Sequence, residues 1–241
     1  MNKEDHKFWD DFQKALEQHD DKTLLKLGLE VIDVEYCDGL DEVTWAKAVQ
    51  CFGWASRFGN VEATYHLANC YFGGGVGVEA NDGIAFRLYK EAAEQGFADA
   101  QIALGEAYLQ GWGVEMNAKE AIKWYEKAAE QGVTDGLWSL GVYYSNGEGA
   151  IKKNEKEAFK WYMKAAELGN VAAQCAVGNC YHKGIGVDVD LAESVKWYKK
   201  SAKKGFYNAQ IMLAKCYQAG TGIRRNSAAA ERWFKKAAEN K

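Results

Sequence analysis

The sequence predicts an all-α protein, a right-handed α-solenoid of helical hairpin repeats. One observation behind this prediction is a recurring segment in which an aromatic pair, small residues and a glycine follow one another: "WYEKAAEQG" at Trp124–Gly132 returns as "WYMKAAELG" at Trp161–Gly169 and as "WYKKSAKKG" at Trp197–Gly205. A second is the period, because the closing glycine recurs every 36 or 37 residues, and such self-similarity is typical of stacked helical hairpins. A third is the presence of 25 glycines and no proline, since glycine ends helices and proline interrupts them. The closing glycines are Gly59, Gly96, Gly132, Gly169 and Gly205.

Three columns of residues predict the first helix of each repeat. A leucine or valine stands four residues before a tyrosine, which places the two side chains on one face of a helix. Directly after the leucine comes alanine or glycine, and so small a residue allows a neighbouring helix to pack closely. The leucine column is Leu67, Leu104, Leu140, Val177 and Leu213; the small column is Ala68, Gly105, Gly141, Gly178 and Ala214; the tyrosine column is Tyr71, Tyr108, Tyr144, Tyr181 and Tyr217.

A glycine-rich turn and a capping residue predict the start of the second helix. Turns such as "GWGV" at Gly111–Val114 follow the tyrosine. Asparagine or aspartate then precedes the first small residue of the second helix by four positions, and these side chains accept hydrogen bonds from the free amides of a helix start. In three copies a glutamate three positions later completes the spacing of a capping box. The caps are Asn81, Asn117, Asn154, Asp190 and Asn226, and the glutamates are Glu120, Glu157 and Glu193.

Taken together, these columns resemble the Sel-1-like repeat, a relative of the tetratricopeptide repeat with a slightly longer hairpin. The shared pattern is A-x-x-x-L-G-x-x-Y-x-x-G-x-G-V, then Asn or Asp, then A-x-x-W-Y-x-K-A-A-E-x-G. We expect five repeats, at residues 59–95, 96–131, 132–168, 169–204 and 205–241, the last of which ends in a C-terminal cap.

The residues before these repeats predict two further elements. Residues 22–58 resemble a degenerate repeat, with "LLKLGLE" at Leu24–Glu30 in the first helix and "AVQCFGWASRFG" at Ala48–Gly59 in the second. Residues 1–21 predict an N-terminal capping helix, whose inward side chains are Phe8, Phe12, Ala15 and Leu16.

Charge and composition exclude several classes of partner. The net charge of -4 gives the whole chain no attraction to nucleic acid or to membrane surfaces, and no stretch approaches the roughly 18 apolar residues of a membrane span. The first 58 residues hold 7 basic and 13 acidic residues, whereas residues 184–241 hold 12 basic and 5 acidic ones, so an acidic protein partner is expected near the C-terminal repeats. The N-terminal sequence lacks a secretory pattern, which predicts a cytoplasmic protein with all six cysteines reduced.

The candidate catalytic and metal-binding residues are too few, and we expect neither an enzyme nor a cofactor. Ser201 begins an S-x-x-K motif, but it replaces an alanine of the repeat, and neither S-D-N nor K-T-G accompanies it. Cys175 and His182 share a helical face without a third ligand, so no metal is expected. The glycine runs, including "GGGVG" at Gly73–Gly77, lack the ending of a phosphate loop and predict turns. Two columns are predicted to be interior, the cysteines Cys70, Cys180 and Cys216 and the tryptophans Trp124, Trp161, Trp197 and Trp233.

The resemblance implies a non-catalytic protein-protein interaction scaffold, adaptor, regulator or inhibitor. A bacterial immunity protein that neutralises a toxin is one specific form of this expectation. Some cysteine-rich, secreted relatives are associated with beta-lactam compounds, so the alternative is a small-ligand-binding protein or a hydrolase of beta-lactam-like compounds.

Partner binding is expected on a stripe along the first helices, formed by the residues two positions before the leucine, two after it and five after it. These positions share one helical face, and in tetratricopeptide repeats that face lines the concave side. The convex face is the alternative surface, and Ile102 and Ile211 have the alternative role of completing the core. Trp138 is the expected anchor, because it is the largest side chain of its column. The stripe consists of Tyr65, Asn69, Phe72, Ile102, Glu106, Leu109, Trp138, Val142, Ser145, Cys175, Asn179, His182, Ile211, Lys215 and Gln218.

Overall fold

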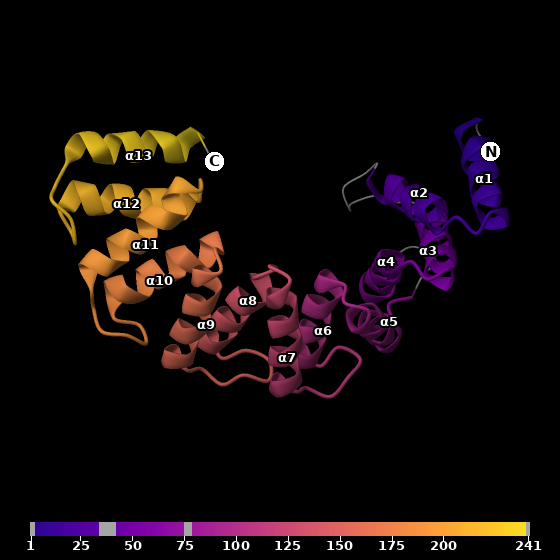
Figure 1. Ribbon diagram of the computed structural model, residues 1–241, viewed down its shortest axis with the longest axis horizontal. Helices are drawn as coiled ribbons and strands as arrows, with labels where there is room; N and C mark the ends of the chain where they lie inside the picture. Colours follow the sequence, from indigo (N-terminus) through magenta and orange to yellow (C-terminus); the bar gives the residue numbers. More distant parts are fainter. Residues whose placement is uncertain (1–2, 34–41, 75–78, 240–241) are drawn as a thin grey trace. The chain divides into compact units, whose positions relative to one another are not determined.

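The computed structural model of the protein describes residues 3–33, 42–74 and 79–239, which form thirteen helices and no strand. The all-helical fold of hairpin repeats that the sequence predicts is confirmed (Figure 1). The helices are α1 (Lys3–Glu17), α2 (Asp21–Asp33), α3 (Glu42–Arg57), α4 (Val61–Gly73), α5 (Asp82–Glu94), α6 (Ala98–Gln110), α7 (Ala118–Glu130), α8 (Asp135–Asn146), α9 (Glu155–Glu167), α10 (Val171–Lys183), α11 (Leu191–Lys203), α12 (Tyr207–Ala219) and α13 (Ser227–Glu239).

The chain divides into two compact units, Met1–Lys127 and Ala128–Lys241. In the first unit α2 packs against α3 and α4 against α5, and in the second α8 packs against α9, α10 against α11 and α12 against α13. Successive hairpins also touch within a unit, as α5 does with α6 and α11 with α12, and Figure 1 shows α11, α12 and α13 lying side by side. Each hairpin therefore buries the face that its neighbour would otherwise leave open.

Within the hairpin, an aromatic ring of the second helix rests on the small residue of the first. A Cβ atom added to Gly105 would lie 2.7 Å from the ring of Tyr125, and one added to Gly178 would lie 2.5 Å from the ring of Tyr198. Both rings are fully buried. The small column is therefore explained by direct contact with a ring rather than by general closeness of two helices.

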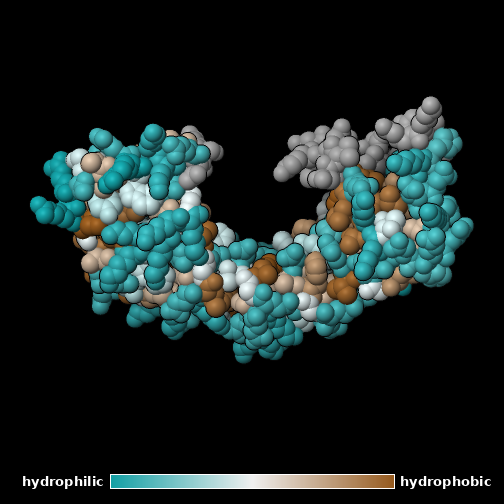
Figure 2. Space-filling view, turned by 45° about the horizontal axis from the view of Figure 1, so that its top comes forward, coloured by the Kyte–Doolittle hydropathy of each residue, from teal (hydrophilic) through white to brown (hydrophobic). Residues whose placement is uncertain are grey.

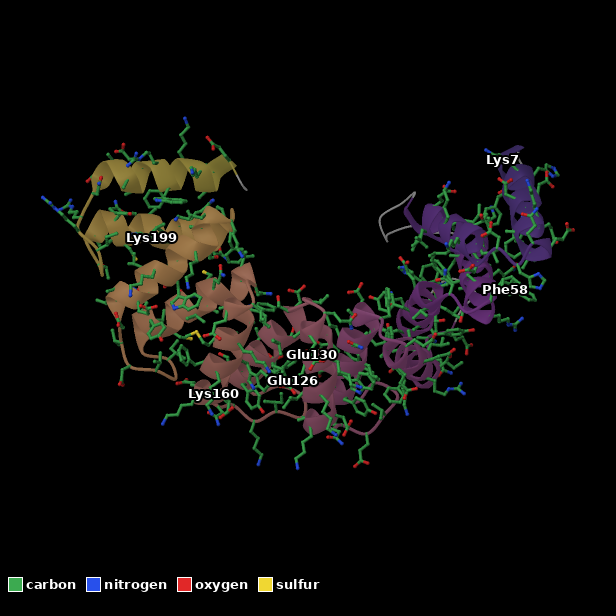
Figure 3. All side chains as sticks on the ribbon, viewed as in Figure 1. Lys7, Phe58, Glu126, Glu130, Lys160 and Lys199 are labelled. Carbon is green, nitrogen blue, oxygen red and sulfur yellow. The ribbon has the colours of Figure 1, made fainter. Side chains whose placement is uncertain are left out.

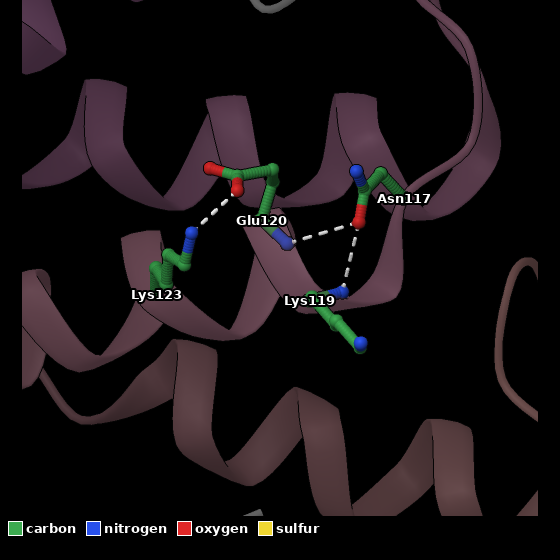
Figure 4. A network of polar contacts seen from close by, with 4 residues as sticks. All are labelled: Asn117, Lys119, Glu120 and Lys123. Carbon is green, nitrogen blue, oxygen red and sulfur yellow. Dashed lines mark hydrogen bonds and ion pairs between the residues drawn. The ribbon is translucent and has the colours of Figure 1, made fainter.

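All five second helices begin at the predicted asparagine or aspartate. The side-chain oxygen of Asn117 accepts hydrogen bonds from the backbone amides of Lys119 at 3.1 Å and Glu120 at 3.2 Å (Figure 4). These bonds satisfy two of the amides that a helix start leaves without a partner. Equivalent bonds are made by Asn81, Asn154, Asp190 and Asn226.

The predicted capping box, in contrast, is wrong. The Glu120 carboxylate does not return to its cap but pairs with Lys123 one turn further along the helix (Figure 4). The reason is that the cap amide is already occupied, because the backbone amide of Asn117 donates to the carbonyl of Tyr108 at 2.8 Å. The same forward pairs join Glu157 to Lys160 and Glu193 to Lys196, and the same backbone bond joins Asn154 to Tyr144 and Asp190 to Tyr181.

A buried glutamine ties the first helix of three repeats to the second helix of the preceding repeat. Its side-chain amide donates to a carbonyl near the helix end, where carbonyls have no partner within their own helix. The signal was present in the sequence as the recurring segments "DAQ", "AAQ" and "NAQ", but the sequence prediction did not use it. The bonds join Gln101 to Ala93, Gln174 to Ala166 and Gln210 to Ala202, at 3.2, 3.1 and 3.3 Å.

Three of the glycine-rich turns pack against the backbone at the start of the second helix of the preceding repeat. Gly113 has a φ of +66°, and a Cβ atom on it would overlap the carbonyl of Asp82 at the start of α5. The same relation holds between Gly186 and Glu155 and between Gly222 and Leu191. The prediction that these glycines form turns is confirmed, although residues 75–77 of the "GGGVG" run lie outside the described residues.

The N-terminal part begins with a helix and a hairpin, as the sequence predicts. Gly28 of α2 lies beneath Phe52 of α3, where an added Cβ atom would come within 2.5 Å of the ring, so this hairpin uses the contact of the later repeats. The four side chains of α1 that were predicted to face inward lie in one apolar cluster, in which Phe12 and Ala15 are buried and Phe8 and Leu16 pack against them.

The tryptophan column packs in the interior, as predicted. Trp124 and Trp197 are buried, and Trp161 and Trp233 are partly buried. In each case the lysine three positions later covers the indole face, at 3.8 Å from the ring centroid for Lys127, 5.3 Å for Lys164, 3.6 Å for Lys200 and 5.0 Å for Lys236. The lysine stem and charge thereby shield a large apolar ring from water.

The five described cysteines are free and buried, and Cys37 lies outside the described residues. Burial raises the pKa of the thiols of Cys51 and Cys70 to about 12 and that of Cys175 and Cys180 to about 11, because the charged thiolate is poorly solvated inside the protein. These thiols are therefore neutral at physiological pH and act as small apolar groups.

Since the aromatic ring leaves no room for a Cβ atom, we expect Gly141→Ala to destabilise the hairpin of α8 and α9, in which Gly141 lies beneath the ring of Tyr162. Overpacking costs about 1–3 kcal/mol, which exceeds the roughly 1 kcal/mol that alanine gains over glycine inside a helix. Gly53 of α3 is the matched control, because a Cβ atom there meets nothing within 4 Å and Gly53→Ala should preserve or raise stability. Urea unfolding followed by circular dichroism measures both, and an unchanged midpoint for Gly141→Ala would contradict the steric argument.

Stability should also fall at alkaline pH. The thiols ionise near pH 9.0 when unfolded and near 11 or 12 when folded, so their contribution is complete below pH 9 and is lost as the pH rises toward 11. Each thiol adds a slope of about 1.4 kcal/mol per pH unit in that window. Urea unfolding at about pH 8 and about pH 10 tests this. Cys51→Ala should reduce the loss of unfolding free energy per pH unit by the contribution of one thiol. Equal free energies of unfolding at the two pH values would refute the prediction.

Candidate partner-binding groove

The second unit contains an open groove of about 540 Å³ that crosses the first helices of its last three repeats. Its walls come from α8, α10 and α12, with one ring from α9 and one from the turn before α12. Figure 2 shows that hydrophilic residues cover much of the face in view, with apolar areas between them. The groove is lined by Trp138, Tyr162, Ala172, Cys175, Ala176, Asn179, Lys183, Phe206, Tyr207, Asn208, Ile211, Met212 and Lys215.

Five residues of the predicted stripe meet in this groove, although they come from three repeats: Trp138, Cys175, Asn179, Ile211 and Lys215. Trp138 is half-buried, so part of its ring is accessible to a ligand. The other stripe residues of this unit do not line the groove; they are Val142, Ser145, His182 and Gln218. That any of them contacts a partner stays a prediction.

In the first unit, the aromatic stripe residues are engaged by other parts of the chain. The ring centroid of Tyr65 lies 5.9 Å from that of Tyr89 and 5.2 Å from that of Phe97. The ring of Phe72 lies 4.5 Å from that of Trp112. These residues pack against the core cluster of the first unit, which leaves less of each ring for a partner.

The stripe residues of α6 differ in how far they are buried. Ile102 and Glu106 are half-buried, whereas Leu109 is fully buried and presents no surface to a partner. Leu109 therefore does not belong to a binding surface in this structure. Helical position fixes the direction of a side chain but not what the neighbouring elements place over it.

Two asparagines of the stripe also have a structural role. The hydroxyl of Tyr198 donates to the side-chain oxygen of Asn179 at 2.8 Å, and that of Tyr89 donates to Asn69 at 2.7 Å. Burial raises the pKa of both tyrosines, so the hydroxyls stay protonated and act as donors. A buried hydroxyl without an acceptor would be costly, and the asparagine supplies that acceptor from the first helix of the same repeat.

Eight lining residues were missed by the sequence prediction. Three of them are neighbours of stripe residues on α10: Ala172 stands three positions before Cys175, Ala176 directly follows Cys175, and Lys183 stands four positions after Asn179. A wider stripe would have included them. On α12, Asn208 stands three positions before the stripe residue Ile211, and Met212 directly follows it. The remaining three are aromatic, and a repeat pattern gives no signal for them because Tyr162 belongs to the packing column and Phe206 and Tyr207 are the N-cap and the first residue of α12.

The charged residues that line the groove are both basic. Lys183 and Lys215 line it, and no aspartate or glutamate does. Lys199, one of the twelve basic residues at positions 184–241, belongs to α11 (Figure 3) and does not line the groove. Its ammonium group lies 5.7 Å from the ring centroid of Tyr217.

The residues considered for catalysis have structural environments. Ser201 is fully buried, and its hydroxyl donates to the carbonyl of Val171 at 2.7 Å, which ties α11 to the start of α10. In the part of the chain that the structure describes, no three His, Cys, Asp or Glu residues lie together as a metal site would require. None of the described helices is long and apolar enough to cross a membrane.

The repeat geometry agrees with a comparison against protein families. The model of the Sel1 repeat matches five segments of the chain, at residues 61–97, 98–133, 134–170, 171–206 and 208–241. The chain belongs to the Sel1 repeat family. The matched segments start two or three residues later than the repeats that the sequence predicted. Residues 22–58 lie outside the match, so their origin as a degenerate Sel1 repeat stays a prediction that the contact between Gly28 and Phe52 supports.

Solved structures show the same fold. A protective antigen of uropathogenic Escherichia coli with an SLR fold is 34% identical to this Sel1 repeat protein, with a TM-score of 0.73; the match covers 96% of this chain and 48% of the antigen, so the chain spans about half the length of that relative. A Sel1 repeat protein from Oxalobacter formigenes is 37% identical, with a TM-score of 0.64 and coverage of 83% and 84%. An immunity protein from Pseudomonas aeruginosa is 20% identical, with a TM-score of 0.52 and coverage of 88% and 80%, which shows a shared fold alone. A search of curated protein sequences gave no match.

We expect Asn179→Ala to lower the free energy of unfolding by about 1–2 kcal/mol, because the Tyr198 hydroxyl loses its acceptor in a buried position. In a Tyr198→Phe background, the same substitution should cost much less, since no hydroxyl remains to be satisfied. A double-mutant cycle by urea unfolding measures this coupling. Additive effects of the two substitutions would show that the hydrogen bond does not contribute to stability.

Proposed function

We propose that this Sel1 repeat protein is a non-catalytic scaffold, adaptor, regulator or inhibitor that holds a segment of a partner protein in the groove of its second unit. The observation that carries the proposal is the convergence of Trp138, Asn179 and Lys215 from three repeats on one groove. A groove that crosses successive first helices suits an extended segment, since each repeat offers it one set of side chains.

Trp138 is the proposed anchor of the interface. It comes from α8, at one end of the set of helices that line the groove, and it is only half-buried in the free protein. A tryptophan that still has accessible surface can bury more apolar area when a ligand binds, and such residues commonly dominate the energy of an interface.

The alternative of a hydrolase of beta-lactam-like compounds receives no specific support. A nucleophile must reach its substrate, but the Ser201 hydroxyl is buried and donates to a backbone carbonyl. The Cys175 thiol does line the groove, but burial raises its pKa to about 11, so that it is neutral at physiological pH. Binding without turnover is therefore the function that we propose.

A bacterial immunity protein that occupies a toxin is one specific form of this proposal. The fold shared with the Pseudomonas aeruginosa immunity protein is compatible with it, and at 20% identity the support extends no further than the fold. We also propose the cytoplasm as the compartment, and the five free, buried cysteines are compatible with a reducing environment.

To test the groove, a randomised peptide library is selected on the immobilised protein, and the selected peptides are measured by fluorescence anisotropy. Trp138→Ala should weaken their binding about thirtyfold, which corresponds to about 2 kcal/mol for an anchor residue. Trp54→Ala is the control, because Trp54 is also partly exposed, at 37%, but lies in the first unit. Circular dichroism checks that both variants fold. Peptides that bind the folded Trp138→Ala protein as well as the wild type would show that the groove is the wrong surface.

A further inference from the structure

The charge of the groove is unusual for this chain. Lys183 of α10 and Lys215 of α12 line it and are exposed, and no acidic residue lines it. The whole chain, in contrast, has 34 acidic and 30 basic residues. Asn179 adds a further donor, since its side-chain oxygen is engaged by Tyr198 and the group that it retains for a ligand is its NH₂. The polar groups around the groove therefore favour a ligand that carries acceptors and negative charge.

The two groove lysines differ from the lysines of the repeat framework, which have partners within the chain. One set of framework lysines pairs with a glutamate three positions earlier: Lys123, Lys160 and Lys196. A second set covers a tryptophan ring: Lys127, Lys164, Lys200 and Lys236. Among the described residues, neither Lys183 nor Lys215 makes an ion pair or a cation-π contact. Both cations are thus free to meet carboxylates of a ligand.

The lining residues that precede the two lysines along α10 and α12 are mainly apolar. Ala176, Cys175, Ile211 and Met212 come from α10 and α12, and the aromatic ring of Phe206 lies at the turn before α12. A volume of about 540 Å³ falls within the range of about 300–1,000 Å³ that is usual for binding pockets. Such a surface accepts a large apolar side chain together with the adjacent peptide backbone.

We infer that the groove recognises an acidic peptide segment in which a large apolar side chain stands next to aspartate or glutamate. The apolar side chain packs between α10 and α12, and the neighbouring carboxylates face Lys183 and Lys215. This inference rests on the proposed function and names the chemistry of the partner. A peptide is favoured over a nucleic acid because the lysines border an apolar surface and do not form a continuous track for phosphates.

The test uses the peptides selected on the wild-type protein. They should be enriched in aspartate and glutamate next to an aromatic or aliphatic residue. Lys183→Glu combined with Lys215→Glu should weaken their binding about tenfold or more, because two favourable charge pairs become repulsive. A selection repeated on this double variant should instead enrich lysine and arginine.

The matched control is Lys152→Glu combined with Lys235→Glu, which changes the net charge equally at two exposed positions that do not line the groove. It should change binding by less than about threefold at 0.1 M salt, where charges more than about 10 Å apart are screened. An equal loss in both double variants would overturn the inference, because general attraction would then explain it.

The failure of this inference is distinguishable from failure of the proposed function. Selected peptides that require Trp138 but show no acidic enrichment would overturn the inference and leave the groove as the binding site. Peptides that do not require Trp138 would overturn both. Binding of a fluorescent oligothymidine that is lost in the Lys183→Glu, Lys215→Glu protein would also overturn the inference, since the groove would then recognise phosphates.

Discussion

The contact between an aromatic ring and a helical glycine determines the geometry of the repeat. Glycine inside a helix costs about 1 kcal/mol relative to alanine, and its presence at Gly105, Gly141 and Gly178 is explained by the ring that lies directly on each. Tyr198 makes two contacts with the first helix, because its ring carbons meet Gly178 and its hydroxyl donates to Asn179, the next residue of that helix. One side chain thus fixes both the distance and the rotation of two helices.

The remaining polar groups of the hairpin then have few possible hydrogen-bond partners. Once the second helix is placed, its first amides bond to the asparagine or aspartate cap, and the amide of the cap residue bonds to the carbonyl of the tyrosine in the last turn of the first helix. The next repeat is tied on by a glutamine such as Gln174, which bonds to a carbonyl at the end of α9. Since these bonds satisfy groups that are buried or at helix ends, the repeat can vary only at positions outside this network.

The sequence was sufficient to predict the fold, because the period, the caps and the small column each report a local contact that recurs in five copies. It was less informative about bonds that reach across elements. The spacing of Glu120 fits a capping box, but it could not show that the cap amide is taken by Tyr108. Trp138 and Lys215 of the stripe do line the groove, but the stripe could not show that Leu109 is covered, because burial depends on what other helices place over it.

The difference between the two units explains where a groove can form. In the first unit, the stripe carries Tyr65 and Phe72, and both rings pack against other aromatic side chains of their own unit. In the second unit the position of α10 that corresponds to Tyr65 is Cys175, which is smaller, and Cys175 lines the open groove. The hairpin framework is the same in both units, so the size of a few stripe residues decides whether that face is filled by the protein itself or remains available to a partner.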